Sequence, residues 1–238
     1  MFDRSLRLRQ TSGLVHGAVS RTVLALSAMA LFIGPDAASA GQEAFLKARM
    51  TVSAPAGAAD LCGRYPWACL RSASAPVRIS GSQLDYAVSL NRQINRQVRS
   101  ISDQAQYGVT EHWALPTSRG GACEDFALLK KKQLIAAGLD PQMLLIATAL
   151  DRRRQAHAVL VMRTERGDFI LDNLRDEVLH WAQTGYTYLR MQDPADPRRW
   201  TAVIEGGILR NDNAVSSPRA GISAGVTVAT PAKVEFSR

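Results

Sequence analysis

The sequence GACEDFA, residues 121–127, lies where a loop gives way to a helix. Pro116 and two consecutive glycines make the residues before Cys123 a loop. The apolar residues of 123–137 are spaced as in a helix that buries one face, and Gly138 supplies a stop at its C-terminal end. The sequence therefore predicts a cysteine in the first turn of a helix.

A thiol at the start of a helix meets the positive end of the helix dipole and unpaired backbone N–H groups. Both favour the thiolate, which is the nucleophilic form of cysteine. A cysteine also occurs at such a place simply as a small buried apolar residue. Cys123 is therefore either an inert buried thiol or a nucleophile, and a base beside it would decide between the two.

An earlier helix and a sheet complete the expected elements. Apolar residues recur every three or four positions over residues 84–106, which predicts a helix with Ser82 as its N-cap. Short apolar runs separated by turn residues follow Cys123 and predict an antiparallel sheet. These runs are residues 143–149, 157–164, 169–172, 186–191 and 200–204.

His157 is the best candidate for the base because it opens one of these strands, which would give it a rigid support. Asp172 ends the next strand, where a carboxylate could accept a hydrogen bond from the imidazole and hold its tautomer. Other interpretations remain open: a core histidine for His157, a loop residue for His112, a surface residue for His180 and a turn residue for Asp172.

The turn between these two strands decides whether Asp172 reaches His157. A two-residue turn at 166–167 would place Asp172 opposite Val161, four residues or about 13 Å along the strand from His157. The two side chains would not meet in that register. A turn nearer 164–165, or a bulge, would bring them together.

The three cysteines form an odd set. Cys62 and Cys69 lie close together and predict a disulfide bond, which leaves Cys123 as a free thiol. The spacing of the histidines and cysteines is not that of a zinc site.

Residues 1–40 have the features of a secretory signal peptide. Arginines precede a short apolar run at 22–34, and Ala-Ser-Ala at 38–40 forms a cleavage site. We expect the mature chain to begin at about Gly41 and to reside in the periplasm. The alternative is an uncleaved membrane anchor.

The composition is typical of a soluble globular protein. Of the 238 residues, 46% are hydrophobic and 21% are charged, which excludes a membrane bundle and a disordered chain. The formal net charge is +8. The basic runs at 130–132 and 152–154 lack interleaved aromatic residues, so we expect no nucleic-acid binding and interpret the basic excess as a solvated surface.

Three motifs, in this order and spacing, resemble those of the bacterial transglutaminase-like cysteine peptidases. They are GACEDFA at 121–127, HAVL at 157–160 and GDFILDN at 167–173. This family includes the periplasmic LapG-type proteases, which cut large surface adhesins. The resemblance covers roughly residues 60–200 and extends to the loop at 61–69 and the segment at 113–116.

The resemblance implies an α+β fold with a papain-like, transglutaminase-like core, in which N-terminal helices pack on an antiparallel sheet. It also implies a triad of Cys123 as nucleophile, His157 as base and then acid, and Asp172 as its orienter. The reaction would pass through a thioester, with the oxyanion held by backbone N–H groups at Cys123. Trp113 is then a candidate for the cleft wall, or else a core aromatic residue. The chemistry needs no cofactor.

Calcium is a further implication of the resemblance, because LapG-type members use acidic residues on both sides of the cysteine to bind it. This chain has Ala122 at the first of those positions, while Glu124 and Asp125 follow the cysteine. Calcium takes six to eight oxygen ligands, so the loss of one puts calcium dependence in doubt. Glu124 and Asp125 could instead simply favour the helix N-terminus.

These inferences divide the chain into four segments. They are a signal peptide at 1–40, an irregular mature N-terminus at 41–60, a transglutaminase-like peptidase domain at 61–205 and a flexible C-terminal tail at 206–238.

The expected function is hydrolysis of a protein substrate, for which a surface adhesin is the candidate that the resemblance suggests. An inner-membrane receptor that regulates the protease is also implied. Two alternatives remain open: transfer of the acyl group to an amine, as in a transglutaminase, and a non-catalytic binding module on the same fold.

Overall fold

A computed structural model describes residues 43–207 of the chain. The signal peptide predicted at 1–40 and nearly all of the tail predicted at 206–238 lie outside these residues. Within the described part, no helix is both long enough and apolar enough to cross a membrane.

The described residues form an α+β fold around one antiparallel sheet of seven strands. The strand order is β1-β7-β6-β2-β3-β4-β5, and every pairing is antiparallel. The strands are β1 (Thr51–Val52), β2 (Leu144–Leu150), β3 (Ala156–Thr164), β4 (Gly167–Leu171), β5 (Leu179–His180), β6 (Thr187–Gln192) and β7 (Trp200–Gly206). The predicted fold class and the strands expected from the sequence are confirmed.

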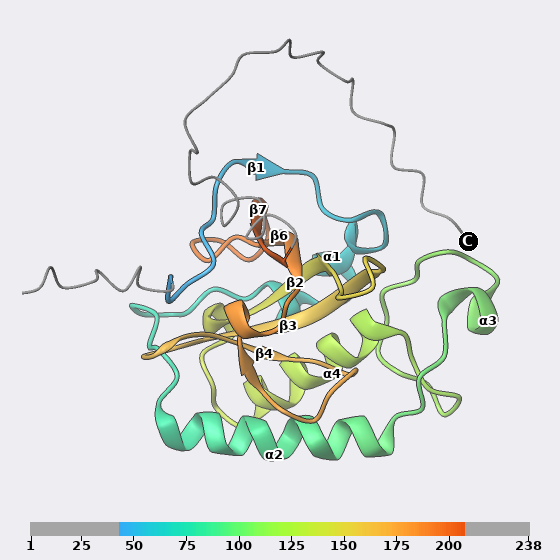
Figure 1. Cartoon of the computed structure of the whole chain (residues 1–238), viewed down its shortest axis with the longest axis horizontal. Helices are drawn as coiled ribbons and strands as arrows, with labels where there is room; N and C mark the ends of the chain where they lie inside the picture. The colour runs from blue at the N-terminus through green and yellow to red at the C-terminus, as the bar shows by residue number, and fades with distance from the viewer. Residues whose placement is uncertain (1–42, 208–238) are drawn as a thin grey trace, which may run out of the picture. The chain divides into compact units, whose positions relative to one another are not determined.

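The two long helices lie on one side of this sheet, with α4 between the sheet and α2 (Figure 1). The α-helices are α1 (Leu61–Arg64), α2 (Gly81–Gln97), α3 (Asp103–Tyr107) and α4 (Cys123–Ala136). Short 3-10 helices span Ala56–Ala58, Pro66–Cys69, Pro141–Met143 and Trp181–Gln183. The N-terminal helices therefore pack on the sheet as expected.

Both faces of the sheet are buried. Along β3, Ala158 and Leu160 point into the cluster shared with α2 and α4, while Val159 and Val161 point into a second cluster on the opposite face. This alternation follows the two-residue period of a strand. A strand buried on both faces is a rigid support for any side chain at its end.

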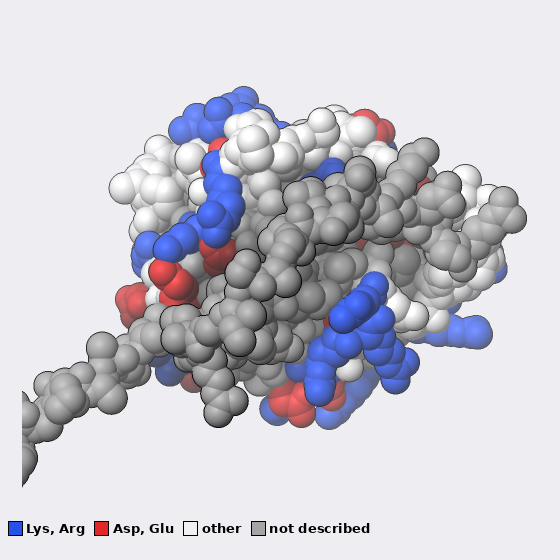
Figure 2. Space-filling model, turned by 45° about the horizontal axis from the view of Figure 1, so that its top comes forward, with Lys and Arg blue, Asp and Glu red and all other residues white. Residues whose placement is uncertain are grey.

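The basic run at 130–132 is not a solvated surface, and that interpretation is wrong for two of its three residues. Lys130 and Lys131 are fully buried, and Lys131 Nζ donates to Gln192 Oε1 at 2.8 Å. The reason is that α4 is covered by the sheet on one side and by α2 on the other. Burial lowers the pKa of each of these two lysines to about 7. On the face shown in Figure 2, the remaining Lys and Arg side chains form separate groups with Asp and Glu among them.

The first long helix is shorter than predicted. It begins after Ser80 rather than Ser82 and ends at Gln97, because Val98 is extended and the chain then pairs with the loop before Cys123. In this pairing the Gly121 N–H donates to Arg99 O at 3.0 Å. Gly120 has φ +125°, and a Cβ there would meet Arg99 O at 2.0 Å, so only glycine fits.

The N-terminal segment is held by a short strand and by a disulfide bond. Thr51 and Val52 pair with β7, although most of the described residues before Asp60 have no regular structure. A disulfide bond joins Cys62 to Cys69 and closes the loop between α1 and the following 3-10 helix.

We predict that replacing both cysteines of this disulfide by serine lowers the free energy of unfolding by about 2–3 kcal/mol, because the unfolded chain regains loop freedom. Urea denaturation of the wild type and of Cys62→Ser/Cys69→Ser measures the difference. Wild type in a reducing buffer is the control and should match the double variant. Equal stability of the oxidised and reduced wild type would contradict the prediction.

Candidate active site

Cys123 is the first residue of α4, as the sequence predicts. The N-cap is Ala122, whose carbonyl accepts the N–H groups of Asp125 and Phe126. The Asp125 carboxylate in turn accepts the N–H groups of Ala122, at 3.1 Å, and Ala114, at 2.9 Å. Asp125 therefore fastens the loop to the helix start and fixes the backbone on both sides of Cys123.

The turn between β3 and β4 brings Asp172 to His157. Thr164 pairs with Gly167, so the turn consists of Glu165 and Arg166, between the two positions, 166–167 and 164–165, that the sequence left open. The Thr164 hydroxyl sets this register, since it donates to Gly167 O at 2.8 Å and accepts from the Arg166 N–H at 3.0 Å.

In this register Asp172 falls opposite Val159, on the same face of the sheet as His157 and two residues from it. Such diagonal neighbours lie within reach of long side chains. His157 Nε2 and Asp172 Oδ1 are 2.8 Å apart, and both side chains are buried. The geometric difficulty raised by the sequence is thereby resolved without a bulge.

Asp172 is held in its charged form by several donors. Burial alone would raise the pKa of Asp172, but hydrogen bonds from His157, Tyr186 and the Leu174 N–H outweigh it and lower that pKa. Tyr186 Oη donates to Asp172 Oδ2 at 2.5 Å, and Arg175 Nε lies 3.5 Å from the same oxygen. The carboxylate is thus a fixed negative charge at His157.

Helix α2 clamps the loop that follows Asp172. Asn95 Nδ2 lies 2.9 Å from both Asp172 O and Arg175 O, and Asn91 Nδ2 lies 3.2 Å from Arg175 O and from Asp176 O. Backbone carbonyls of an irregular loop are thereby satisfied by side chains of a rigid helix. These two asparagines fix the position of Asp172 from outside the sheet.

The thiol of Cys123 lies against the strand that carries His157. Ala158, the residue after His157, donates its N–H to Cys123 Sγ at 3.3 Å. Because Nε2 of His157 bonds to Asp172, the other ring nitrogen, Nδ1, is the one left for a second partner. The structure therefore joins His157 to Asp172 and places Cys123 against Ala158, the residue that follows His157.

The resting state of Cys123 differs from the expectation. Burial and the neighbouring Glu124 charge raise the pKa of the thiol well above its ordinary value, despite the helix start and the Ala158 N–H. The thiol donates to Glu124 Oε2 at 3.2 Å. Burial and a hydrogen bond with Asp103 raise the pKa of Glu124 to about 8. At neutral pH the site thus holds a thiol next to a protonated carboxyl group.

Several of the oxygens around Cys123 that could bind calcium hold backbone N–H groups. Ala122 has no side-chain oxygen, both Asp125 oxygens accept backbone N–H groups, and Asp103 Oδ2 accepts the His112 N–H. Within residues 43–207, no group of three or more His, Cys, Asp or Glu side chains could hold a metal ion. Asp103 Oδ1 has no hydrogen-bond partner among the described residues, and Glu124 lies beside Asp103.

Trp113 belongs to the core and does not wall a cleft. Its side chain is 3% exposed and packs edge-on against Trp200, with 5.8 Å between ring centroids. Of the other histidines, His112 lies in a loop with its ring tilted against Tyr107, and His180 packs against Phe169. Neither is in contact with Cys123 or Asp172 in the described structure.

Tyr186, Arg175, Asn91 and Asn95 were not singled out by sequence reasoning. Their partners lie on other elements, so no local spacing points to them. One usable signal was the pair Asn91 and Asn95, which falls on the buried side of an otherwise apolar helix face. A buried amide in that place implies a partner to satisfy it.

The comparison with protein families supplies independent information. The family described as bacterial transglutaminase-like cysteine proteinase (BTLCP) matches residues 48–207. A comparison with curated proteins found no match.

Three solved structures of LapG from Legionella pneumophila are similar to this chain. The EGTA-treated form is 24% identical with a TM-score of 0.39, covering 45% of this chain and 62% of that one. A second LapG structure has 21% identity, a TM-score of 0.42 and coverage of 55% and 74%. The calcium-bound form has 24% identity, a TM-score of 0.40 and coverage of 54% and 80%. This chain thus spans less than two thirds of the LapG chain in the first of these structures.

We predict that Glu124→Gln speeds the alkylation of Cys123 at pH 9 by about threefold to tenfold, because no carboxylate then opposes the thiolate. At pH 6 the two proteins should react alike, since Glu124 is protonated there in the wild type as well. The rate of reaction with iodoacetamide at both pH values measures this. Glu165→Gln, at an exposed carboxylate, is the matched control. A slower reaction of Glu124→Gln at pH 9 would contradict the prediction.

Proposed function

Because the chain belongs to the bacterial transglutaminase-like cysteine proteinase family, we propose that it is a cysteine peptidase that cuts a protein substrate with Cys123, His157 and Asp172. The observation that carries the proposal is the buried 2.8 Å contact between His157 and Asp172, next to a thiol at a helix start. A nucleophile, a base and an orienting carboxylate are the three parts that acyl transfer needs.

In the first step, Cys123 Sγ attacks the carbonyl carbon of the scissile bond and gives its proton to His157. The imidazolium is stabilised by Asp172, which stays ionised. Asp172 accepts the hydrogen bond from His157 Nε2–H, so His157 Nδ1 is the ring nitrogen that takes the proton from the thiol. General-base help is needed here because the pKa of the resting thiol is raised.

The carbonyl oxygen becomes an oxyanion in this step. The N–H of Cys123 is its proposed donor, since N–H groups of the first helical turn have no acceptor within the helix. His157 then returns the proton to the departing amine, the C–N bond breaks and a thioester forms. Water attacks the thioester with His157 again as base, which releases the acid and the free thiol.

We place this activity in the periplasm. The features of residues 1–40 support export, and the Cys62–Cys69 disulfide suits an oxidising compartment. A surface protein of the same cell is then the accessible class of substrate. An adhesin and a membrane receptor that controls the protease are the substrate and regulator that we propose on the resemblance to LapG-type proteases.

The proposal predicts that the mature protein generates new N-termini in surface proteins released from the bacterium that encodes it. Cys123→Ala should abolish these cuts, and His157→Ala should slow them by about 10²- to 10⁴-fold. Labelling of free amines followed by mass spectrometry identifies the cut sites.

Glu165→Gln is the control that should cut like the wild type. Undiminished cutting by Cys123→Ala would refute the proposal. Incorporation of an added fluorescent amine into proteins, with no new N-termini, would identify the chain as an acyl transferase to amines. Biological activity that survives Cys123→Ala would instead favour a binding module.

A further inference from the structure

A hollow of about 300 Å³ lies next to the proposed triad. One wall is the turn between β2 and β3, including Arg152, Arg153 and Gln155, and the other is the loop after β4, with Arg175. Tyr186 also lines it. The β2–β3 turn and the loop after β4 thus border this space at the end of the sheet where His157 lies.

The walls of this hollow are in direct contact with the triad. Tyr186 donates to Asp172, and its ring packs edge-on against His157 with 5.6 Å between centroids. Gln155 stands two residues before His157 in the chain, and the Leu174 N–H donates to Asp172. The hollow therefore borders two of the three residues that we propose to act on the substrate.

The charge of the hollow is positive. Its lining has three arginines and one carboxylate, Asp151. Asp151 Oδ1 accepts the N–H groups of Arg153, at 2.7 Å, and Gln155, at 2.8 Å. This carboxylate therefore holds the backbone of the β2–β3 turn. Among the described residues, no carboxylate lies within ion-pair distance of Arg152 or Arg153.

The arginines are not equivalent. Arg175 is committed to the triad, because Nε lies 3.5 Å from Asp172 and the guanidinium covers the Tyr186 ring. The stem of Arg152 passes Gly185, where an added Cβ would lie 3.4 Å from it, an ordinary van der Waals distance. Arg152 and Arg153 are therefore two exposed guanidinium groups without an anionic partner among residues 43–207, beside Arg175, which is paired with Asp172.

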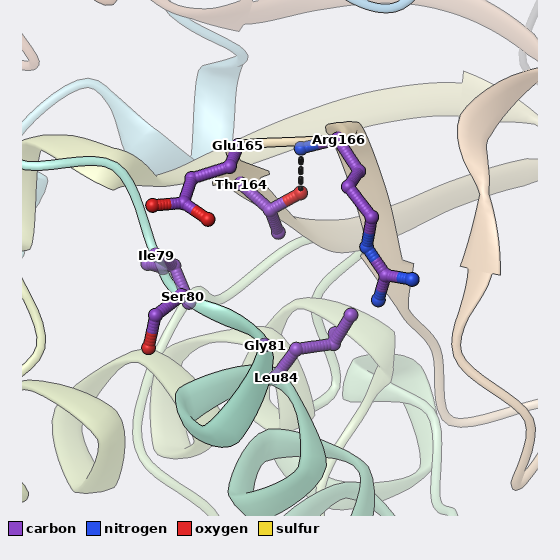
Figure 3. A pocket seen from close by; sticks show the side chains of 7 residues that line it. All are labelled: Ile79, Ser80, Gly81, Leu84, Thr164, Glu165 and Arg166. Atoms are coloured by element: carbon purple, nitrogen blue, oxygen red, sulfur yellow. Dashed lines mark hydrogen bonds between the residues drawn. The ribbon is translucent and has the colours of Figure 1, made fainter.

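A second hollow, of about 180 Å³, lacks these properties. It lies between the start of α2 and the β3–β4 turn, and its lining includes one acidic and one basic side chain, Glu165 and Arg166, which point apart (Figure 3). It is at the far end of β3, seven residues or about 23 Å from His157. A substrate side chain in it would have no bearing on where Cys123 cuts.

We propose that the hollow lined by Arg152 and Arg153 binds an acidic side chain of the substrate, so that cleavage occurs at a set distance from an Asp or Glu. A carboxylate fits the planar guanidinium fork with two parallel hydrogen bonds. It would also relieve the repulsion between the three arginines. This inference rests on the proposed function, since it names the substrate class of the same site.

Peptide reagents that alkylate Cys123 test this without knowledge of the natural substrate. In one series a bromoacetyl group precedes the peptide, and in the other a chloromethyl ketone follows it, so both directions from the sulfur are sampled. Each peptide carries a single Glu, or Gln in its matched partner, at one to four residues from the reactive group. Mass spectrometry gives the rate of Cys123 modification.

At one spacing, the Glu peptide should react about tenfold faster than its Gln partner with the wild type, as expected for a charge-assisted hydrogen bond. Arg152→Gln/Arg153→Gln should reduce this ratio to about one and leave the rate with iodoacetamide unchanged. Arg71→Gln, at an exposed arginine outside the hollow, should keep the full ratio.

A ratio near one at every spacing, with Cys123 still reactive towards iodoacetamide, would overturn this inference and leave the proposed function standing. A preference for Glu that survives in Arg152→Gln/Arg153→Gln would also overturn it. A Cys123 that reacts with none of the reagents would refute the proposed function and the inference with it.

Discussion

The contact between His157 and Asp172 is the constraint on which the rest of the site depends. The imidazole and the carboxylate are both buried, with His157 Nε2 2.8 Å from Asp172 Oδ1. Each gives the other the hydrogen-bond partner that a buried polar group needs. The β3–β4 register sets which residues face each other, and Thr164 sets that register at the turn. A shift of this turn to 166–167 would place Asp172 opposite Val161, four residues along the strand from His157.

Around this contact the structure separates two electrostatic environments. Asp172 is surrounded by donors, and its pKa is lowered. Burial and a hydrogen bond with Asp103 outweigh the backbone donor at Glu124, so the pKa of Glu124 is raised to about 8. The same fold thus keeps one carboxylate charged to support an imidazolium and another neutral beside the thiol. Cys123 rests as a thiol between them and depends on His157 for its activation.

The sequence predicted the parts of the site that lie at the ends of elements. Cys123 was identifiable because glycines and a helix pattern meet there, and His157 because it opens an apolar strand. The role of Tyr186 could not be identified from the sequence, since this residue reaches Asp172 from the start of another strand. Burial of Lys130 was equally hidden, because a run of lysines looks solvated until α2 and the sheet are seen to cover it. Local pattern predicts elements and their ends, whereas contacts between elements need the register.

The central claim is that His157 activates Cys123, and the pH dependence of Cys123 alkylation by iodoacetamide tests it most directly. The measurement compares the wild type with His157→Ala between about pH 4 and pH 9. We expect the wild type to react at least about tenfold faster than His157→Ala near neutral pH, because only the wild type has an acceptor for the thiol proton. Superimposable profiles of the two proteins would contradict the account.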